Sequence, residues 1–436
     1  MAEARVAPMG VVAAAFLAVL VGLGFPSSAH SARVDVSVFG TIEHARSDSP
    51  YRYRRFVDDQ GTWNRGSVFG LQLDAELQPG WRATVQSRLA PSIQSDDRWE
   101  HTFPWAFLSW RPEDDWRVRV GKVRAPGYLH AENMDVGSTF AYAQLPIEMY
   151  SLSPSMDITG VLLNKEWAWG VGDIGLDAYW GKSNIHWRMF FREGLPGVLE
   201  PGTKFMPLSL DLRGALLAYR MRDDVYQIGL HHIHSENDEG NFWPRPMLVE
   251  PIPGVQFYDV FPSAERHGYK RLALWILNAG VDVGLGDRYR MSAEVAVRRS
   301  DRKFEGLNAT GGYVAVRRDW GAWTPYVSVA HLRSQRGVLQ TYHAMDQTTV
   351  PSAVPGADLI RASQIIGADS LQPFDQGSWA IGTSYSMTTN QKLKIEWVRT
   401  RIGSVPSMVD MVDIPSGVAG WDRSIHSVGV SYSFVF

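Results

Sequence analysis

Arginine side chains recur on the polar face of two neighbouring alternating segments, and guanidinium groups are strong donors to carboxylates and other anions. The first pair lies in 81–90 and the second in 116–124. The residues are Arg82, Arg88, Arg117 and Arg119. If this face is wet, the array can bind and orient charged or dipolar molecules. If each arginine is paired with Asp74, Glu76 or Asp177 on an adjacent segment, the array contributes nothing specific.

Residues suited to covalent or metal chemistry are sparse. The sequence contains no GxSxG motif, no glycine-rich phosphate loop and no cysteine, which argues against the common nucleophiles, disulfides and thiolate metal sites. His232 and His234 share a face and could hold a metal with Glu236 or Asp238, but we expect exposed histidines at a strand end instead. The sequence therefore predicts no enzyme, no metal site and no cofactor.

Composition narrows the class of protein further. The chain has 436 residues, 45% of them hydrophobic and 12% aromatic, with a net charge of -3. A charge so close to neutral gives no reason to expect a nucleic-acid partner. After the N-terminal region, the longest apolar run is Leu272 to Leu277, far short of the roughly 18 residues that a membrane helix needs.

Alternation of apolar and polar residues predicts an all-β chain of about sixteen antiparallel strands. Tight turns rich in Gly, Pro, Asp and Asn alternate with long connectors, of which 125–156 is the third. The predicted spans are 33–45, 66–78, 81–90, 103–111, 116–124, 157–169, 174–182, 209–222, 225–234, 270–285, 288–300, 307–318, 323–334, 376–388, 391–402 and 423–436.

One apolar face per strand is the pattern of a transmembrane β-barrel, in which side chains alternate between lipid and lumen. In 423–436, Val428 and Val430 alternate with small or polar residues, and the segment ends on Phe436. By the same parity we expect further charges inside the barrel at Asp211, Arg213, Arg290, Glu294, Arg298, Lys392, Lys394 and Glu396. Aromatic residues near strand ends, including Trp81 and Trp105, predict girdles at the two membrane interfaces.

The N-terminus has the features of a secretory signal peptide. Arg5 precedes an apolar run from Val11 to Leu23, and Ser27 to Ala29 offers small residues for cleavage. We expect residues 1–29 to be the signal peptide and residues 30–436 to be the barrel domain. An even strand count then places the short turns on the periplasmic side and the long loops outside.

The stretch from Ala106 to Leu129, followed by Glu132 to Tyr150, resembles the hairpin that leads into the third outer loop of porins. With the signal peptide, the strand count and the terminal Phe, the whole mature chain resembles the general porin family of Gram-negative bacteria. The resemblance implies an integral outer-membrane barrel that assembles as a homotrimer, in contact with outer-membrane lipid and lipopolysaccharide. It also implies that the loop at about 125–156 folds into the lumen as a constriction.

The resemblance gives the charged residues an expected role. Glu132, Asp135 and Glu148 of the loop would face Arg82, Arg88, Arg117 and Arg119 across the constriction. Such a transverse field orients dipolar solutes and passes both ion signs with a moderate preference. The expected function is passive diffusion of small hydrophilic solutes and ions through a water-filled channel.

Two alternatives remain open from sequence. The first is a substrate-specific channel or receptor whose long loops recognise one solute. The second is a barrel scaffold that sleeves a partner protein supplied separately.

Overall fold

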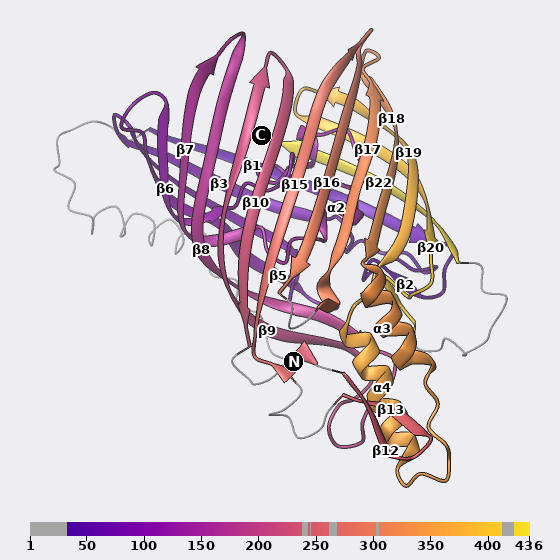
Figure 1. Ribbon diagram of the computed structural model, residues 1–436. Helices are drawn as coiled ribbons and strands as arrows, with labels where there is room; N and C mark the ends of the chain where they lie inside the picture. The colour runs from indigo at the N-terminus through magenta and orange to yellow at the C-terminus, as the bar shows by residue number, and fades with distance from the viewer. Residues whose placement is uncertain (1–32, 238–242, 245, 261–267, 302–304, 412–422) are drawn as a thin grey trace.

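Sixteen strands form a single antiparallel sheet that closes into a barrel in the computed structural model (Figure 1). The structure describes residues 33–237, 243–244, 246–260, 268–301, 305–411 and 423–436, so the predicted signal peptide lies outside the described residues. The prediction of an all-β, antiparallel barrel of about sixteen strands is confirmed. The barrel strands are β1 (Arg33–Ser47), β3 (Val68–Gln78), β4 (Trp81–Pro91), β5 (Trp99–Trp110), β6 (Trp116–Arg124), β7 (Asp157–Trp169), β8 (Gly172–Phe191), β9 (Gly202–Met221), β10 (Asp224–Glu236), β15 (Arg271–Gly286), β16 (Tyr289–Ser300), β17 (Ala309–Arg318), β18 (Trp323–Ser334), β19 (Asp375–Thr388), β20 (Gln391–Ile402) and β22 (Ser424–Val435).

Closure is achieved by β1, which pairs with β3 on one side and with β22 on the other. Thr41 illustrates this, since it is opposite Val68 in one register and opposite Ser433 in the other. Every barrel strand therefore has two neighbours and no edge remains unpaired, as a sheet in lipid requires. Among the described residues, no helix is both long and apolar enough to cross a membrane.

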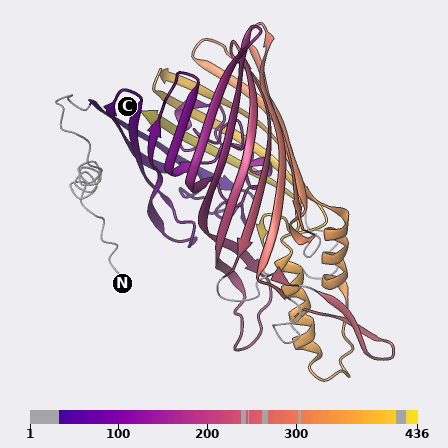
Figure 2. The same ribbon diagram turned by 60° about the vertical axis from the view of Figure 1, so that its left-hand side comes forward.

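The long connectors carry the remaining elements. Helices α3 (Arg336–Gln347) and α4 (Ala357–Ser370) gather at one end of the barrel with the hairpin of β12 (Met247–Ile252) and β13 (Val255–Asp259) (Figures 1 and 2). The other short elements of the described chain lie in loops between barrel strands. These other elements are β2 (Arg52–Tyr53), η1 (Gly137–Thr139), α2 (Ile147–Tyr150), β11 (Trp243–Pro244), β14 (Gly268–Tyr269), η2 (Glu305–Leu307) and β21 (Val409–Asp410).

Strands β8 and β9 are much longer than predicted, because their hairpin continues past the rim of the barrel and is covered there. Met189 and Phe191 of β8 are buried and pack against Ile366 of α4. The prediction treated 183–208 as a loop. The β8–β9 ladder continues to the pair Phe191 and Gly202, and the contact with a helix from a distant connector buries this extension of the sheet.

The outer face of the barrel is apolar, as the alternation predicts. On β22, Val428 and Val430 are 45% and 43% exposed, whereas Ser431 between Val430 and Tyr432 is buried. Neighbouring strands continue this surface. Its exposed large side chains include Ile42, Val120, Val161, Leu217, Ile228, Leu277, Val295, Val314, Val327, Ile381 and Ile395.

The loop-side half of the barrel interior is filled by an apolar core. Tyr128, Tyr142 and Leu152 of the third long connector pack in one cluster with inward side chains of β9 and β15. Those strand residues are Leu208, Leu210, Leu212, Leu272, Leu274 and Ile276. A packed interior excludes water here, so the lumen is not uniformly water-filled over its whole cross-section.

This packed interior reverses the expected faces of β9, and the inward assignment of Asp211 and Arg213 was wrong. Arg213 is exposed, shares its face with the exposed Leu217, and its Nε donates to His232 Nδ1 at 3.2 Å. The intervening leucines point inward, because protein rather than water fills the barrel at this level.

The outer face gives a direct test of barrel orientation. Val430→Arg places a charge on the exposed apolar surface and should lower the free energy of unfolding from lipid vesicles by about 2–4 kcal/mol if the site is near the bilayer midplane. Urea titration of the refolded protein measures this value, with Val430→Leu as the control. A Val430→Arg protein as stable as the parent would mean that this face does not contact lipid.

Candidate functional site

The segment 125–156 connects β6 to β7 and is bonded to the barrel wall formed by β16, β18 and β20. Lys394 of β20 donates through Nζ to the carbonyl oxygens of Gly137 at 2.6 Å and Tyr142 at 2.8 Å. On β18, the Tyr326 hydroxyl accepts the amide of Ala143 at 2.9 Å. These inward polar side chains therefore hold the segment in place instead of lining open water.

A second set of contacts comes from β16. Glu294 is buried and accepts hydrogen bonds from the Leu129 amide at 2.7 Å and from the hydroxyls of Tyr150 at 3.0 Å and Tyr313 at 2.9 Å. The Tyr142 hydroxyl bonds to Ser292 Oγ at 3.0 Å. We call the wall from β16 to β20 the far wall, because it is distant in the barrel order from β6 and β7, where the segment begins and ends.

The opposite side, here called the near wall, comprises β3 to β6 and carries the predicted arginines. Asp135 of the segment pairs with Arg88 at 3.0 Å and with Arg124 at 2.9 Å. Glu132 pairs with Arg119 at 2.9 Å. The structure thus brings two predicted carboxylates into contact with two predicted arginines.

Arg82 and Arg117 are placed differently. Neither has a carboxylate within ion-pair distance among the described residues. Both line a cavity of about 400 Å³ on the turn side of the segment, and Arg117 also lines an adjoining cavity of about 290 Å³. Arg119 and Glu132 line both cavities, so the two spaces meet at this ion pair.

Glu148 is separated from the other six predicted residues. Its side chain is completely buried, and it accepts hydrogen bonds from Gln376 Nε2 at 2.9 Å and Ser378 Oγ at 2.8 Å on β19. Arg54 lies 3.5 Å away from the same carboxylate. The residue therefore anchors the segment to the far wall and does not line either turn-side cavity.

Two aromatic residues of the near wall were not anticipated as part of this site. Trp105 and Phe107 line the 400 Å³ cavity, and Phe107 is opposite Thr84, which belongs to the inward face of β4. The girdle prediction for Trp105 was therefore wrong. Its parity with Phe107 was the available signal, although a register shift between Gln86 and Arg88 obscures the match to β4.

A third cavity, of about 460 Å³, lies on the loop side of the segment. Gln144, Ile147 and Ser151 form one side of it, and the long connectors together with the loop-side ends of β8 and β16 form the rest. Arginine is the most frequent lining residue. The lining arginines are Arg54, Arg55, Arg65, Arg188, Arg192 and Arg298.

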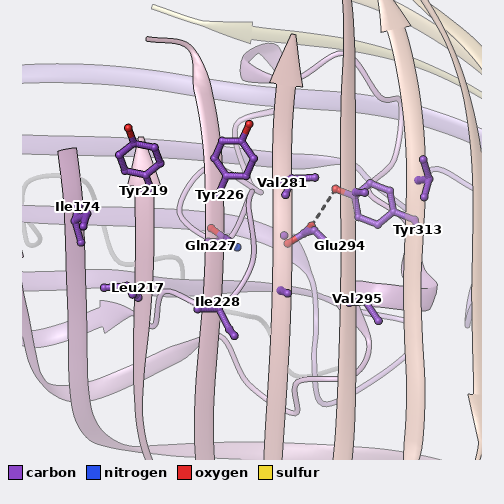
Figure 3. Close-up of a pocket in the computed structure, with 14 residues that line it drawn as sticks. Ile174, Leu217, Tyr219, Tyr226, Gln227, Ile228, Val281, Glu294, Val295 and Tyr313 are labelled. Atoms are coloured by element: carbon purple, nitrogen blue, oxygen red, sulfur yellow. Dashed lines mark hydrogen bonds between the residues drawn. The ribbon is translucent and has the colours of Figure 1, made fainter. Parts of the chain in front are cut away.

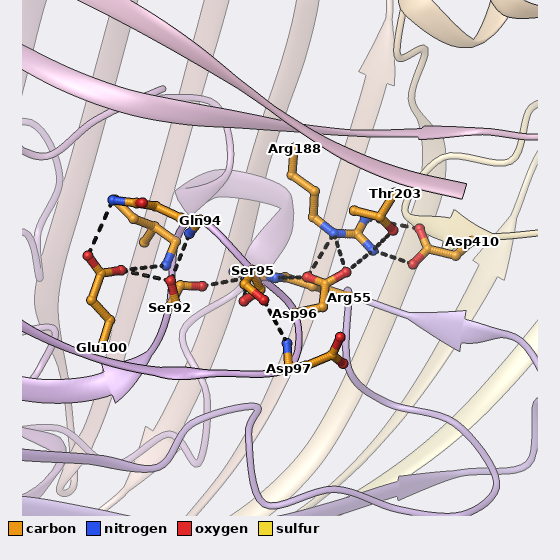
Figure 4. A network of polar contacts seen from close by, with 11 residues as sticks. Arg55, Ser92, Gln94, Ser95, Asp96, Asp97, Glu100, Arg188, Thr203 and Asp410 are labelled. Carbon is orange, nitrogen blue, oxygen red and sulfur yellow. Dashed lines mark hydrogen bonds and ion pairs between the residues drawn. The ribbon is translucent and has the colours of Figure 1, made fainter. Parts of the chain in front are cut away.

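The outer loops are joined by a network of ion pairs centred on Asp96 (Figure 4). Asp96 lies between β4 and β5 and pairs with Arg55 of the first long connector and with Arg188 of β8. Arg188 also pairs with Asp410 of the last long connector, through Nη1 to Oδ1 at 3.0 Å. Three connectors that are distant in sequence are thereby tied to one another and to β8 at the mouth of the barrel.

Burial opposes ionisation of both carboxylates in this network. For Asp96, burial raises the pKa but the hydrogen bonds and charges of Arg188 and Arg55 outweigh it, so the pKa is below its usual value. For Asp410, burial dominates over Arg188 and the pKa is raised. Asp96 is thus the carboxylate that remains ionised most readily.

Two further features lie in the wall of the barrel, apart from the three cavities described above. The rings of His232 and His234 are 4.4 Å apart on the outer surface, and no cluster of three or more metal-binding side chains occurs in the described ranges. A hollow of about 570 Å³ lies in the sheet between β8 and β17 (Figure 3). Its rim is formed mainly by outward apolar side chains such as Leu217, Ile228 and Val295.

Comparison with known proteins identifies the fold. No protein-family model and no curated protein matches the sequence. The anion-selective porin from Comamonas acidovorans is 9% identical, with 93% of this chain and 100% of that chain covered and a TM-score of 0.50. The outer membrane channel DcaP of Acinetobacter baumannii is 12% identical over 95% and 99% of the two chains, at 0.48. OprB of Pseudomonas putida is 12% identical over 92% and 94%, at 0.49. The chain has a porin-like fold.

The Asp96 network predicts a pH dependence of the outer loops. Because the pKa of Asp96 is lowered in the folded protein, its ionised form stabilises the loops above the unfolded value of about 3.9. That contribution is lost as the pH falls through the lower, folded pKa. Asp96→Asn should remove it at neutral pH, and amide exchange in residues 92–98 should become about tenfold faster at pH 7.

The neighbouring carboxylate supplies the control for this experiment. Asp97→Asn makes the same change of charge, but no ion pair of Asp97 is present in the described structure. Its amide exchange should match the parent at pH 7. Equal exchange rates in the Asp96→Asn and Asp97→Asn proteins would contradict a role of Asp96 in holding the loops.

Proposed function

We propose that the protein is an outer-membrane channel through which small hydrophilic solutes and ions diffuse. The observation that carries this proposal is the unequal division of the barrel interior. Segment 125–156 is packed against the far wall, whereas two charged cavities lie on its other side. One cavity follows the near wall, and the other lies between the segment, β6 and the strands from β7 to β10. A polar, partly open strip inside an apolar-surfaced barrel is suited to solutes that keep part of their hydration.

The charges of this strip are balanced in number. Five arginines and five carboxylates line the two turn-side cavities. They are Arg82, Arg111, Arg117, Arg119 and Arg220, with Asp74, Glu76, Glu132, Glu166 and Asp177. This balance supports a passage for both ion signs with a moderate preference, and it supports the predicted pore-lining role of the near-wall arginines.

The constriction is assigned to the level of Asp135. Its carboxylate connects the segment to Arg88 and Arg124 of the near wall, and these three side chains are only 13%, 19% and 3% exposed. We therefore expect the near-wall strip to be narrowest at this contact. A solute that passes this level must move beside the ion pairs or displace them.

The same features of the barrel interior bear on the two alternative functions, a scaffold for a partner protein and a substrate-specific channel. A barrel that sleeves a partner protein needs an open lumen, but the segment and the apolar core occupy the loop-side half. A substrate-specific channel fits the observations as well as a general one. Assembly as a homotrimer and contact with outer-membrane lipid and lipopolysaccharide stay predictions, as does export directed by residues 1–29.

Conductance in planar bilayers tests the proposed function and the near-wall arginines together. The refolded protein should give stable single-channel steps, and Arg82→Gln with Arg117→Gln should lower the anion-to-cation permeability ratio by a factor of about two to three. That factor corresponds to roughly 0.5 kcal/mol for unpaired charges in a screened lumen. Reversal potentials in a salt gradient measure the ratio, with Arg46→Gln on the outer face as the control.

The outcome that contradicts the channel is a silent bilayer from protein that has folded into vesicles. If channels form but the double variant keeps the parent reversal potential, the passage does not follow Arg82 and Arg117. The second result would leave the channel standing and exclude only this route.

The assignment of the constriction has its own test. Asp135→Asn leaves Arg88 and Arg124 without their shared carboxylate, so the segment should separate from the near wall and single-channel conductance should rise. Because the contact is largely buried, we also expect a loss of about 3 kcal/mol in the free energy of unfolding. Unchanged conductance in a measurably destabilised Asp135→Asn protein would place the narrowest point elsewhere.

A further inference from the structure

The loop-side cavity has the size and the enclosure of a small-molecule site. Its volume of about 460 Å³ falls within the range of roughly 300–1,000 Å³ that ligand sites occupy. Segment 125–156 closes it on the lumen side through Gln144, Ile147 and Ser151, and the long connectors with the loop-side ends of β8 and β16 surround the rest. A solute that enters the barrel from the loop side reaches this space before the constriction.

The positive charges around the cavity are compensated with one exception. Five of the six lining arginines form ion pairs with carboxylates, whereas Arg298 has none among the residues that the structure describes. Each of the five can be assigned a different carboxylate. The pairs are Arg54 with Glu148, Arg55 with Asp96, Arg65 with Glu43, Arg188 with Asp410 and Arg192 with Asp369.

Arg298 is a fixed and desolvated guanidinium. It is 1% exposed, its Nε donates to the Leu307 carbonyl at 2.7 Å, and its Nη1 donates to the Leu152 carbonyl at 3.2 Å. Its Nη2 has no hydrogen-bond partner, nor has the buried hydroxyl of Ser151, and both residues line the cavity. A buried charge without a counter-ion is costly, and a carboxylate in the cavity would offset that cost through a charge-assisted hydrogen bond.

Apolar side chains and rings make up much of the remaining lining, beside the arginine-paired Asp369 and Asp410. The ring centre of Phe374 is 5.8 Å from Arg298 Cζ, so an aromatic surface lies beside the charge. Other apolar and aromatic residues continue this lining. They are Phe56, Ile147, Trp187, Phe190, Tyr342, Met408 and Met411. A ligand with a hydrophobic body would bury apolar area here that an inorganic anion cannot.

We propose that this cavity binds a small monocarboxylate with an aromatic or otherwise apolar body. Arg298 Nη2 and the Ser151 hydroxyl hold the carboxylate, and the rings around Phe374 hold the body. Because one lining arginine lacks a counter-ion, we expect a ligand with a single negative charge. As a substrate class for transport this inference rests on the proposed function, but binding itself does not require conduction.

Titration calorimetry of the full-length, refolded protein in detergent tests the site with benzoate as the probe. Benzamide is the matched control, because it keeps the ring and replaces the carboxylate with a neutral amide. We expect saturable binding of benzoate with one site per chain, and benzamide and acetate should each bind at least about tenfold more weakly. Equal affinity for benzoate and benzamide, or no saturable benzoate binding, would overturn the proposal.

Variants assign the binding to these residues. Arg298→Met should weaken benzoate binding at least tenfold, Arg298→Lys should retain part of it, and Ser151→Ala should weaken it a few-fold. Arg46→Met on the outer face serves as the control and should bind like the parent. If Arg298→Met does not fold, the Ser151→Ala result and the benzoate-to-benzamide ratio of the parent still decide the matter.

The calorimetric result is independent of the channel. Benzoate binding by a protein that forms no conducting pores would uphold this site and contradict the proposed function. Conducting pores without benzoate binding would do the reverse. Benzoate binding that Arg298→Met leaves unchanged would show that the anion is held elsewhere and would overturn the assignment.

Discussion

The arrangement of the interior depends on how segment 125–156 is held between two walls of the closed barrel. On the far wall, Glu294 and Lys394 are buried and give their hydrogen-bonding capacity to the backbone and hydroxyl groups of the segment. Buried polar groups carry a large penalty unless they are satisfied, so these contacts fix the segment to one side. The near wall is joined to the segment through the Asp135 and Glu132 ion pairs and through a hydrogen bond from Arg124 to the Ala131 carbonyl. The unequal attachment creates the charged strip that we assign as the passage.

The same asymmetry separates two chemical environments inside one barrel. Below the segment, two cavities present balanced charges, and Trp105 and Phe107 line the one along the near wall. Above it, the cavity is closed by outer loops that are tied through Asp96, and it presents one uncompensated guanidinium among rings. A solute from the loop side would therefore first meet a site that favours an apolar monocarboxylate, and then a strip that discriminates weakly by charge. Binding at the loop-side site would therefore precede diffusion through the charged strip.

The barrel could be predicted from sequence because period-two alternation and turn residues act locally. Val428 and Val430 show how reliably this pattern identifies the outer face. The pattern failed where the environment of a strand was set by distant segments. Asp211 and Arg213 lie outside because the core fills the loop-side interior. Strand β8 continues to Phe191 and β9 begins at Gly202, in the part of their hairpin on which α4 packs. Similarly, the arginines could be found by their alternation, but which of them lack a counter-ion depends on where loop carboxylates such as Asp135 and Glu148 come to lie.

The most direct test of this account is the accessibility of each wall to a thiol reagent in the conducting protein. The chain has no cysteine, so single cysteines can report on chosen positions. Ser109→Cys lies in the near-wall cavity, and Ser378→Cys lies on the far wall beneath the segment, bonded in the parent to Glu148. A charged methanethiosulfonate should reduce the current of the Ser109→Cys channel and leave that of the Ser378→Cys channel unchanged. Block of the Ser378→Cys channel with no effect on Ser109→Cys would contradict a passage along the near wall.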